Sequence, residues 1–415
     1  MTSLKKINSI KVLATTLLST MLVAAIAIAC VGAFSSTALA STGTSYTINV
    51  KFGQTEARNM LTSINQWRTG SEAWAWNQDN ATKTTYSSAA LSYDYDLEKV
   101  AMQRAAEIAV SYSHTRPDGQ NTWSAYSDMG YAYMTCGENI AAGQTSANAV
   151  YISWREDNYK YEGQGHRRNM LNPNFKAIGI GHVYFNGLHY WVQEFSDRVH
   201  NATAPAANDS STNVNVNINP SSITKTSIAA STKSISAKVG TSFTLPTATL
   251  QLCTTDYWNY MSPTFPVVAT PTYTISSSYL KRSGTKATPL KAGKTSITVK
   301  VYDKSVTVPV TISKGTNPLS VKAASKTIKV KASKLMSKAQ SISGAIKFSN
   351  KGKGKITYTK SSGKKNFTVN KKTGKITVKK GTRKGSYTVK IKVKAAGNAS
   401  YKSATKTVAV KIKVN

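Results

Sequence analysis

Residues 176–195 read KAIGIGHVYFNGLHYWVQEF, and this stretch decides how the first part of the chain folds. Two runs rich in apolar residues, 176–184 and 188–195, are separated by the dipeptide Asn186-Gly187. β-Branched and aromatic residues favour strands. Asn-Gly is the preferred pair for a tight two-residue hairpin turn, because both residues tolerate a positive φ. The pattern predicts two antiparallel strands joined by that turn.

The residues before the hairpin carry helical periodicity. Apolar residues recur at the spacing of one helix face over 60–67, over 97–112 and over 149–154. Helices that share a domain with an antiparallel sheet must cover its apolar surface. We therefore expect an α+β domain, built as a sandwich of helices and sheet, over residues 50–200.

The net charge of +36, from 54 basic and 18 acidic residues, is unevenly distributed. Residues 41–200 hold 13 basic and 15 acidic residues, whereas residues 201–415 hold 38 basic and only 3 acidic ones. A near-neutral domain is therefore joined to a strongly basic remainder, which excludes a single domain with a diffuse basic surface. Such a field attracts any polyanion, so charge by itself does not single out nucleic acid.

The N-terminal residues have the composition of a secretory signal. Lysines precede a mostly apolar run over 12–34, and the small residues Ala38-Leu39-Ala40 follow. Residues 1–40 therefore predict a signal peptide and a secreted protein, extracellular or associated with the cell wall. Two alternatives stay open. The apolar run approaches the ~20 residues of a membrane span, which would make it an uncleaved anchor, and Cys30 could carry a lipid.

After residue 200 the chain changes to the period-two pattern of strands. Residues 201–222 are rich in Asn, Ser, Thr, Ala and Pro without periodicity, which is typical of a linker. Alternation over 223–314, with Gly and Pro between the runs, predicts a β-sandwich. Residues 315–415 alternate in the same way but hold 27 basic residues and no acidic one. We expect a second all-β domain there, with one apolar, buried sheet face and one face covered by lysines.

Candidate site residues gather in the first domain. His114, Glu138 and His166 lie in the segments SHTRPDG, GENIA and GHRRNML, and Glu156 and Asp157 follow the third helix. Two imidazoles and two carboxylates could surround a divalent ion, and two histidine ligands leave positions open for water. A carboxylate beside that water could act as a base. Histidines are more often structural, so spacing alone does not establish a metal site.

These segments occur in an order and spacing that resemble the CAP superfamily, also called SCP-like, in its bacterial secreted members. The resemblance covers about residues 54–199 and rests on SHTRPDG, GENIA, a Trp before acids, GHRRNML and YWVQEF. It implies an α-β-α sandwich with a cleft lined by two histidines and two acids. In the family the histidine pair can bind zinc or another divalent cation. Carried onto this sequence, His114 and His166 are the metal ligands and Glu138 is one acid.

The second acid departs from the family pattern, in which a Glu usually stands three residues after the Trp. Here that position holds Asp157, and Glu156 stands one residue earlier. Neighbouring helix positions point about 100° apart, so only one of the two can face the cleft. Since Asp157 occupies the family's position three residues after the Trp, we predict that Asp157 rather than Glu156 faces the cleft.

Other aromatic or reactive residues are interpreted as structural. The motifs do not explain residues 70–89, and their Trp74 and Trp76 are expected to pack in the core or at the rim. Cys136 would need a base in contact to act as a nucleophile, whereas a buried small hydrophobe is the commoner role of a cysteine. The same structural interpretation applies to the remaining histidines: His182, His189 and His200.

The two basic domains also resemble known modules. Segments Ser236–Leu245 and Ala287–Val299 are similar to bacterial Ig-like modules, and Phe367–Val378 and Ala395–Tyr401 to lysine-rich β repeats of secreted Gram-positive proteins. We expect two all-β Ig-like sandwich modules. Outside a cell, their excess of lysine favours anionic cell-wall polymers as partners, bound by a screened attraction of low specificity. Nucleic acid is not favoured, because the aromatic platform that single strands require is missing.

The sequence thus predicts a Gram-positive cell-surface protein. In the first hypothesis the cleft binds a divalent metal, zinc foremost, and a small or lipid-like ligand, while the basic modules hold the cell wall. The second is a metal-dependent hydrolase acting on peptide or cell-wall material, and the third a structural adhesion protein with a vestigial cleft. The sequence offers no obvious nucleophile and no third strong metal ligand, which leads us away from a defined enzyme.

Overall fold

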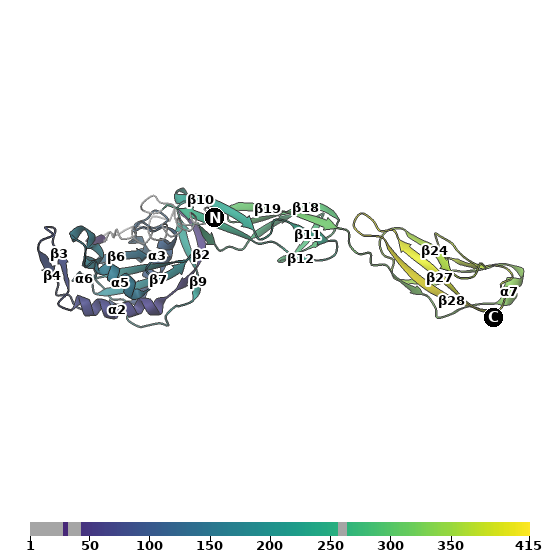
Figure 1. Cartoon of the computed structure of the whole chain (residues 1–415), viewed down its shortest axis with the longest axis horizontal. Coiled ribbons are helices and arrows are strands. Elements are labelled where there is room, and N and C mark those ends of the chain that lie inside the picture. Colours follow the sequence, from purple (N-terminus) through teal and green to yellow (C-terminus); the bar gives the residue numbers. More distant parts are fainter. Residues whose placement is uncertain (1–27, 32–42, 256–263) are drawn as a thin grey trace, which may run out of the picture. The chain divides into compact units, whose positions relative to one another are not determined.

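A computed structural model of the chain describes residues 28–31, 43–255 and 264–415 (Figure 1). Two compact units divide the chain: unit 1 is Met1–Ile228 with Thr249–Thr270, and unit 2 is Ala229–Ala248 with Pro271–Asn415. The predicted signal peptide, residues 1–40, lies outside the described residues except for Ile28–Val31. Within the described ranges, no helix has the length and apolar character needed to cross a bilayer.

Unit 1 is built on a seven-stranded sheet with the order β1-β6-β8-β7-β2-β9, and β5 pairs with β7. The predicted hairpin lies within it: β7 and β8 pair antiparallel across Asn186 and Gly187, whose φ angles are 50° and 90°. These positive values belong to the turn that Asn-Gly favours. The strands are β1 (Ile28–Val31), β2 (Thr44–Phe52), β5 (Ser92–Tyr93), β6 (Thr135–Ala142), β7 (Ala177–Phe185), β8 (Leu188–Ser196) and β9 (Ser211–Ile218), with β3 (Trp74–Trp76) and β4 (Lys83–Thr85) as a separate hairpin.

Helices cover both faces of this sheet. Strand β7 shows this, because its alternate residues pack against different helices on the two faces. Gly179 and Gly181 lie against helix α3 (Tyr95–Val110), and a Cβ on Gly181 would be 2.2 Å from a backbone carbonyl oxygen of that helix. Ile178 and Ile180 belong to the core on the opposite face. Only glycine lets the helix backbone approach so closely. The result is the three-layer α-β-α sandwich that was predicted.

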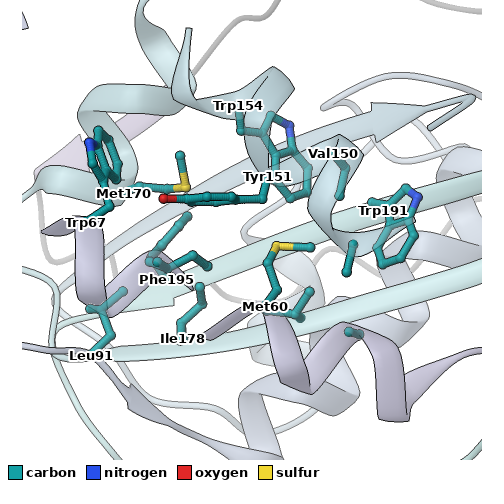
Figure 2. Close-up of a cluster of buried hydrophobic side chains, with 14 of the residues drawn as sticks. Met60, Trp67, Leu91, Val150, Tyr151, Trp154, Met170, Ile178, Trp191 and Phe195 are labelled. Carbon is teal, nitrogen blue, oxygen red and sulfur yellow. The ribbon is translucent and has the colours of Figure 1, made fainter. Parts of the chain in front are cut away.

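The main core of unit 1 lies between the sheet and helices α2, α5 and α6 (Figure 2). Its buried side chains include Met60, Ile64 and Trp67 of α2, Val150 and Trp154 of α5, Met170 of α6, and Trp191 and Phe195 of β8. The apolar spacings predicted over 60–67 and 149–154 therefore supply the packed helix faces. The remaining helices of unit 1 are α2 (Gln54–Arg68), α4 (Ser124–Asp128), α5 (Ala147–Arg155) and α6 (Gly165–Leu171), with short 3-10 turns at η1 (Tyr161–Gly163) and η2 (Pro220–Ser222).

The prediction that residues 201–222 form a linker is wrong for the part of this range that forms β9. This strand pairs antiparallel with β2 along its whole length and buries Val216 and Ile218 completely. Its alternate asparagines accept hydrogen bonds from the side chains of Thr47 and Asn49 on the exposed face. The polar half of the alternation gave the segment the composition of a linker, although its apolar half completes the sheet.

The boundary predicted at residue 223 is also wrong, because unit 1 takes in residues 249–270. Thr254 there donates a hydrogen bond to the carbonyl oxygen of Val110 at the end of α3. The ring of Phe265 lies 6.1 Å from that of Phe185, at the end of β7. Thr254 and Phe265 belong to a three-stranded sheet. Its strands lie in the order β10 (Ile223–Ala230), β13 (Ala248–Thr254) and β14 (Phe265–Val267).

Unit 2 begins with an all-β module, as predicted. Two sheets, β11-β19-β18-β15 and β12-β17-β16, share a buried core that includes Leu245, Ile297, Val299 and Val310. Alternating residues of the two longest strands, β18 and β19, provide half of the buried residues of this core. The strands are β11 (Ile235–Lys238), β12 (Phe243–Thr244), β15 (Thr272–Ile275), β16 (Leu280–Ser283), β17 (Lys286–Pro289), β18 (Gly293–Val301) and β19 (Lys304–Ser313).

Residues 315–415 form a second mostly-β module around the sheet β21-β28-β27-β24. Val389, Ile391 and Val393 of β27 are completely buried, and the lysines between them are exposed. The predicted division into an apolar face and a lysine face is therefore confirmed. The elements are β20 (Ser320–Ala323), β21 (Ile328–Val330), α7 (Ala332–Ser337), β22 (Gln340–Ile342), β23 (Ile346–Asn350), β24 (Ile356–Ser362), β25 (Phe367–Val369), β26 (Ile376–Val378), β27 (Gly385–Ala395) and β28 (Ala404–Val414).

Candidate functional site

His114 and Glu138 form the first of two histidine–carboxylate pairs in unit 1. His114 follows α3 in an irregular segment, and Glu138 lies on β6 with its side chain completely buried. The two meet at 2.6 Å between Nδ1 of His114 and Oε1 of Glu138. A carboxylate oxygen accepts, so the imidazole donates through Nδ1, and a neutral ring then has its lone pair on Nε2.

Glu138 stays ionised because buried cations compensate its burial. Nε of Arg104 donates to Oε2 at 2.8 Å, and the hydroxyl of Thr122 donates to the same oxygen at 2.7 Å. Burial alone would raise the pKa of Glu138, but Arg104 and His114 hold that pKa well below its usual range. Arg104 also pairs with Glu107, which Arg116 contacts through two nitrogens. A buried chain of alternating charges therefore supports the first pair.

Glu156 and His166 form the second pair. Helix α5 ends at Arg155, and Glu156 follows in the left-handed region with φ of 51°. Oε1 of Glu156 lies 2.7 Å from Nδ1 of His166, and Oε2 accepts a hydrogen bond from the backbone N–H of Arg167 at 3.2 Å. Only 2% of the surface of Glu156 is exposed. Both histidines thus use Nδ1 on a buried carboxylate.

The prediction that Asp157 faces the site is wrong. The carboxylate of Asp157 pairs with Arg155 and, at 2.5 Å, with Nη1 of Arg167, and 39% of its side chain is exposed. The 100° rotation between neighbouring residues holds only inside a helix. The backbone of Glu156 turns left-handed directly after α5. For this reason Glu156 reaches His166, although Asp157 stands at the family's position after the Trp.

Nε2 of His166 is buried and has no hydrogen-bond partner among the described residues. Buried polar atoms are nearly always satisfied, so an exception calls for an explanation. In the described parts of the chain, no group of three or more His, Cys, Asp or Glu side chains is arranged to hold a metal. The acids therefore orient the histidines, and the candidate ligands are the two imidazoles.

Polar residues of the motifs join the element of one pair to that of the other. Asn139 donates to the carbonyl oxygen of His166 at 3.2 Å, and Asn169 donates to that of Glu138 at 3.2 Å. Asn169 also donates to the Asn139 side chain, at 2.9 Å. These amides attach α6 to β6. We did not single them out from the sequence, although each stands in a quoted motif.

The unexplained stretch 70–89 supports the second pair. Its hairpin, β3 with β4, carries Trp74, whose ring lies 3.4 Å from Nζ of Lys83 and 4.3 Å from Cζ of Arg167. The backbone N–H of Trp76 donates to the side chain of Gln164, which itself donates to the carbonyl oxygen of Glu156. These contacts agree with the predicted packing role.

Glu194 is a buried acid that the sequence reasoning missed. It lies opposite Glu138 across the β6–β8 pairing and accepts a hydrogen bond from Tyr126 at 2.8 Å. Burial, together with the charge of Glu138, raises the pKa of Glu194 well above its usual range. The signal in the sequence would have been a position for Glu194, in YWVQEF, directly across the strand pair from Glu138, in GENIA. The pKa values of the two neighbouring carboxyl groups are therefore shifted in opposite directions.

The other reactive residues lie in packed surroundings. Cys136 is completely buried in a cluster with Leu97 and Tyr126, which agrees with its interpretation as a small hydrophobe. His182 stacks on Trp191 with ring centroids 3.6 Å apart, and its Nε2 lies 2.8 Å from Nδ1 of His189. Burial, followed by the effect of His189, lowers the pKa of His182 to about 4. The two histidines form a separate structural pair.

Comparisons with known proteins match the part of the chain that carries the site. Residues 61–195 match the model of the family described as CAP, the cysteine-rich secretory protein family. The uncharacterized protein YkwD of Bacillus subtilis is 33% identical over 107 residues, which is 25% of this chain and 38% of that protein. This chain therefore matches well under half of that relative's length.

Solved structures align with lower similarity. An extracellular protein containing a SCP domain from Bacillus anthracis aligns over 35% of this chain and 41% of its own, with 20% identity and a TM-score of 0.27. Human protocadherin-24 EC1-2 aligns over 46% of this chain and 97% of its own, with 13% identity and a TM-score of 0.24.

Proposed function

We propose that the chain, whose residues 61–195 form a CAP domain, is a secreted surface protein whose His114 and His166 bind one divalent cation. Zinc is the first candidate, because imidazole nitrogen is among its preferred ligands and two protein ligands leave positions open to a further ligand. The bound ion would supply a Lewis acid that attracts an anionic or carbonyl oxygen.

The single observation that carries this proposal is the common hydrogen bonding of the two histidines. Each directs Nδ1 to a carboxylate, Glu138 or Glu156, at 2.6 or 2.7 Å. Carboxylate–histidine pairs of this kind fix the ring and its tautomer in metal sites and leave the other nitrogen for the metal. The unpartnered, buried Nε2 of His166 fits such a ligand.

A ligand-binding role is favoured over hydrolysis by the same contacts. A hydrolase would need a carboxylate able to accept a proton from water. Glu138 instead accepts hydrogen bonds from three side chains, and Glu156 accepts from His166 and Arg167. Ile152 stands in α5 four residues before Glu156, and the backbone N–H of Tyr159 donates to the carbonyl oxygen of Glu156; the two side chains are 56% and 41% exposed. These exposed apolar and aromatic side chains support a small or lipid-like ligand as the second component of the site.

We further propose that the basic modules hold the protein at anionic cell-wall polymers. Residues 315–415 carry 27 basic residues and no acidic one, so their attraction to a polyanion meets no opposing charge within the module. The CAP domain would not share this attachment, because residues 41–200 hold 13 basic and 15 acidic residues. Secretion is supported by the signal peptide predicted over 1–40.

Titration calorimetry with zinc tests the metal site. The full chain is expected to bind one zinc ion near neutral pH, and both His166→Ala and the double variant His114→Ala/His166→Ala are expected to lose that site. His200→Ala is the matched control, because His200 is exposed and contacts the carbonyl oxygen of Ala132 instead. Zinc uptake by the double variant equal to that of the unchanged chain would rule the proposal out.

A further inference from the structure

The outer face of the sheet β21-β28-β27-β24 carries six exposed lysines, and we call this set the lysine track. Three lie in one row on β27 and two on β28, while one lies on β21. The five lysines of β27 and β28 stand between buried residues, and Lys329 stands between the half-buried Ile328 and the buried Val330, so all six side chains leave the same face. The members are Lys390, Lys392, Lys394, Lys411, Lys413 and Lys329.

The register of the strands arranges these lysines in a line rather than a block. Lys392 and Lys394 face threonines on both neighbouring strands, and Lys390 faces Ser362 and Ala409. Lys411 faces Thr388, so the row on β27 continues diagonally onto β28. The backbone positions of successive lysines are about 7 Å apart, both along a strand and across the diagonal.

The track ends in an uncompensated contact between like charges. Lys413 of β28 lies directly beside Lys329 of β21 in the parallel pairing. Like charges at directly opposed positions destabilise a sheet. Because residues 315–415 contain no Asp or Glu, no acidic side chain of the module can relieve this repulsion. An anion from outside would relieve it.

We propose that the lysine track binds a linear polyol-phosphate polymer, with successive phosphates on successive lysines. This inference rests on the proposed attachment to anionic polymer and names the face and the chemical class. Six single bonds separate neighbouring phosphorus atoms in a glycerol-phosphate chain. A polypeptide spans at most ~3.6 Å for three backbone bonds, so a six-bond repeat reaches about 7 Å when extended. That length matches the spacing of the track.

Other polyanions fit this face less well. Single-stranded nucleic acid has a similar phosphate repeat, but its binding sites add aromatic side chains on which the bases stack. The outward positions of β27 and β28 are occupied by Lys, Thr, Ser and Ala. The threonine hydroxyls that flank Lys392 and Lys394 can donate to phosphate oxygens beside each ammonium group.

Two charge-matched variants of the full chain test the track. One replaces its six lysines by glutamine. The control replaces six exposed lysines outside the strands of the same module: Lys326, Lys351, Lys365, Lys372, Lys380 and Lys384. Binding of poly(glycerol phosphate) and of a DNA duplex is measured by fluorescence anisotropy between 50 and 200 mM salt. Both variants lose the same net charge, so only position differs.

Six phosphate contacts predict a slope of log affinity against log salt near −4, and about a 250-fold loss over that salt range. The track variant is expected to bind poly(glycerol phosphate) at least about 30-fold more weakly at 50 mM salt. The control variant is expected to stay within about threefold of the unchanged chain.

Equal losses in the two variants would overturn the track and leave diffuse attachment by the basic module intact. Failure of the unchanged chain to bind any polyanion would instead overturn the proposed attachment itself. Duplex DNA binding as tightly as poly(glycerol phosphate) would overturn the assignment of the polymer class. Circular dichroism of both variants verifies that the sheet is retained.

Discussion

Replacing His182 by Phe is expected to change how the stability of unit 1 depends on pH. His182 has 4% of its surface exposed and stacks on Trp191. Its Nδ1 lies 3.4 Å from the carbonyl oxygen of Gly53, and its Nε2 lies 2.8 Å from His189. A carbonyl only accepts, so the neutral ring donates through Nδ1 and accepts through Nε2. Protonation of His182 would remove that acceptor.

The magnitude follows from the pKa of His182. Burial, and then His189, lower this pKa from 6.5 to about 4. Between these values the unfolded chain binds more protons than the folded chain, so this side chain contributes stability above pH 6.5 that is lost as the pH falls toward 4. Linkage between the two pKa values gives a loss of about 2 kcal/mol between pH 7.5 and pH 5.

Urea unfolding followed by tryptophan fluorescence measures this loss, because the six tryptophans among the described residues all belong to unit 1. Glu194 has a raised pKa and acts in the opposite direction, so the unchanged chain is compared with His182→Phe at each pH. The difference in unfolding free energy should shift by about 2 kcal/mol in favour of the variant from pH 7.5 to pH 5. His200→Gln, at an exposed histidine, serves as the control. A difference between His182→Phe and the unchanged chain that stays constant with pH would refute the reasoning.

Three further outcomes are expected. Glu156→Gln should weaken zinc binding about 10- to 100-fold, whereas Asp157→Asn should change it less than about threefold; the reverse order in calorimetry would contradict the assignment of the second acid. Gly181→Ala should destabilise unit 1 by about 1–3 kcal/mol or more, because the new Cβ would lie 2.2 Å from the carbonyl oxygen of Ala101, and unchanged urea unfolding would argue against that close approach. Ile218→Ala should cost about 2–5 kcal/mol in the same assay, since a completely buried side chain is lost; a linker residue would show no effect.

The hairpin and the helices could be predicted because their signals are local. Asn186-Gly187 specifies its own turn, and the apolar spacing over 60–67 is the face that α2 packs into the core. Each of these features depends on neighbours within one element.

The second acid could not be predicted in this way. Its assignment depends on where α5 ends, and a left-handed Glu directly after Arg155 has no local signal of the kind that glycine would give. Once the helix ends there, helical geometry no longer determines the directions in which the side chains of Glu156 and Asp157 point. The backbone N–H of Arg167 and the Nδ1 of His166, distant in sequence, select the acid instead.

The strand β9 was missed because composition and pattern pointed in opposite directions. Its asparagines suggested a linker, while Val216 and Ile218 are buried at period two against β2. The charges that support Glu138 were missed for a related reason. Arg104 stands within the apolar stripe of α3, beside Ala101 and Ala105, and a cation at such a position is buried and paired.

The central claim is that His114 and His166 hold one metal ion through their Nε2 atoms while Glu138 and Glu156 hold Nδ1. X-ray absorption at the zinc edge of the loaded full chain measures this coordination most directly. Two imidazole nitrogens at about 2.0–2.1 Å and no sulfur are expected, with the imidazole signal lost in the double histidine-to-alanine variant. Sulfur at about 2.3 Å, or an imidazole signal retained in that variant, would contradict it.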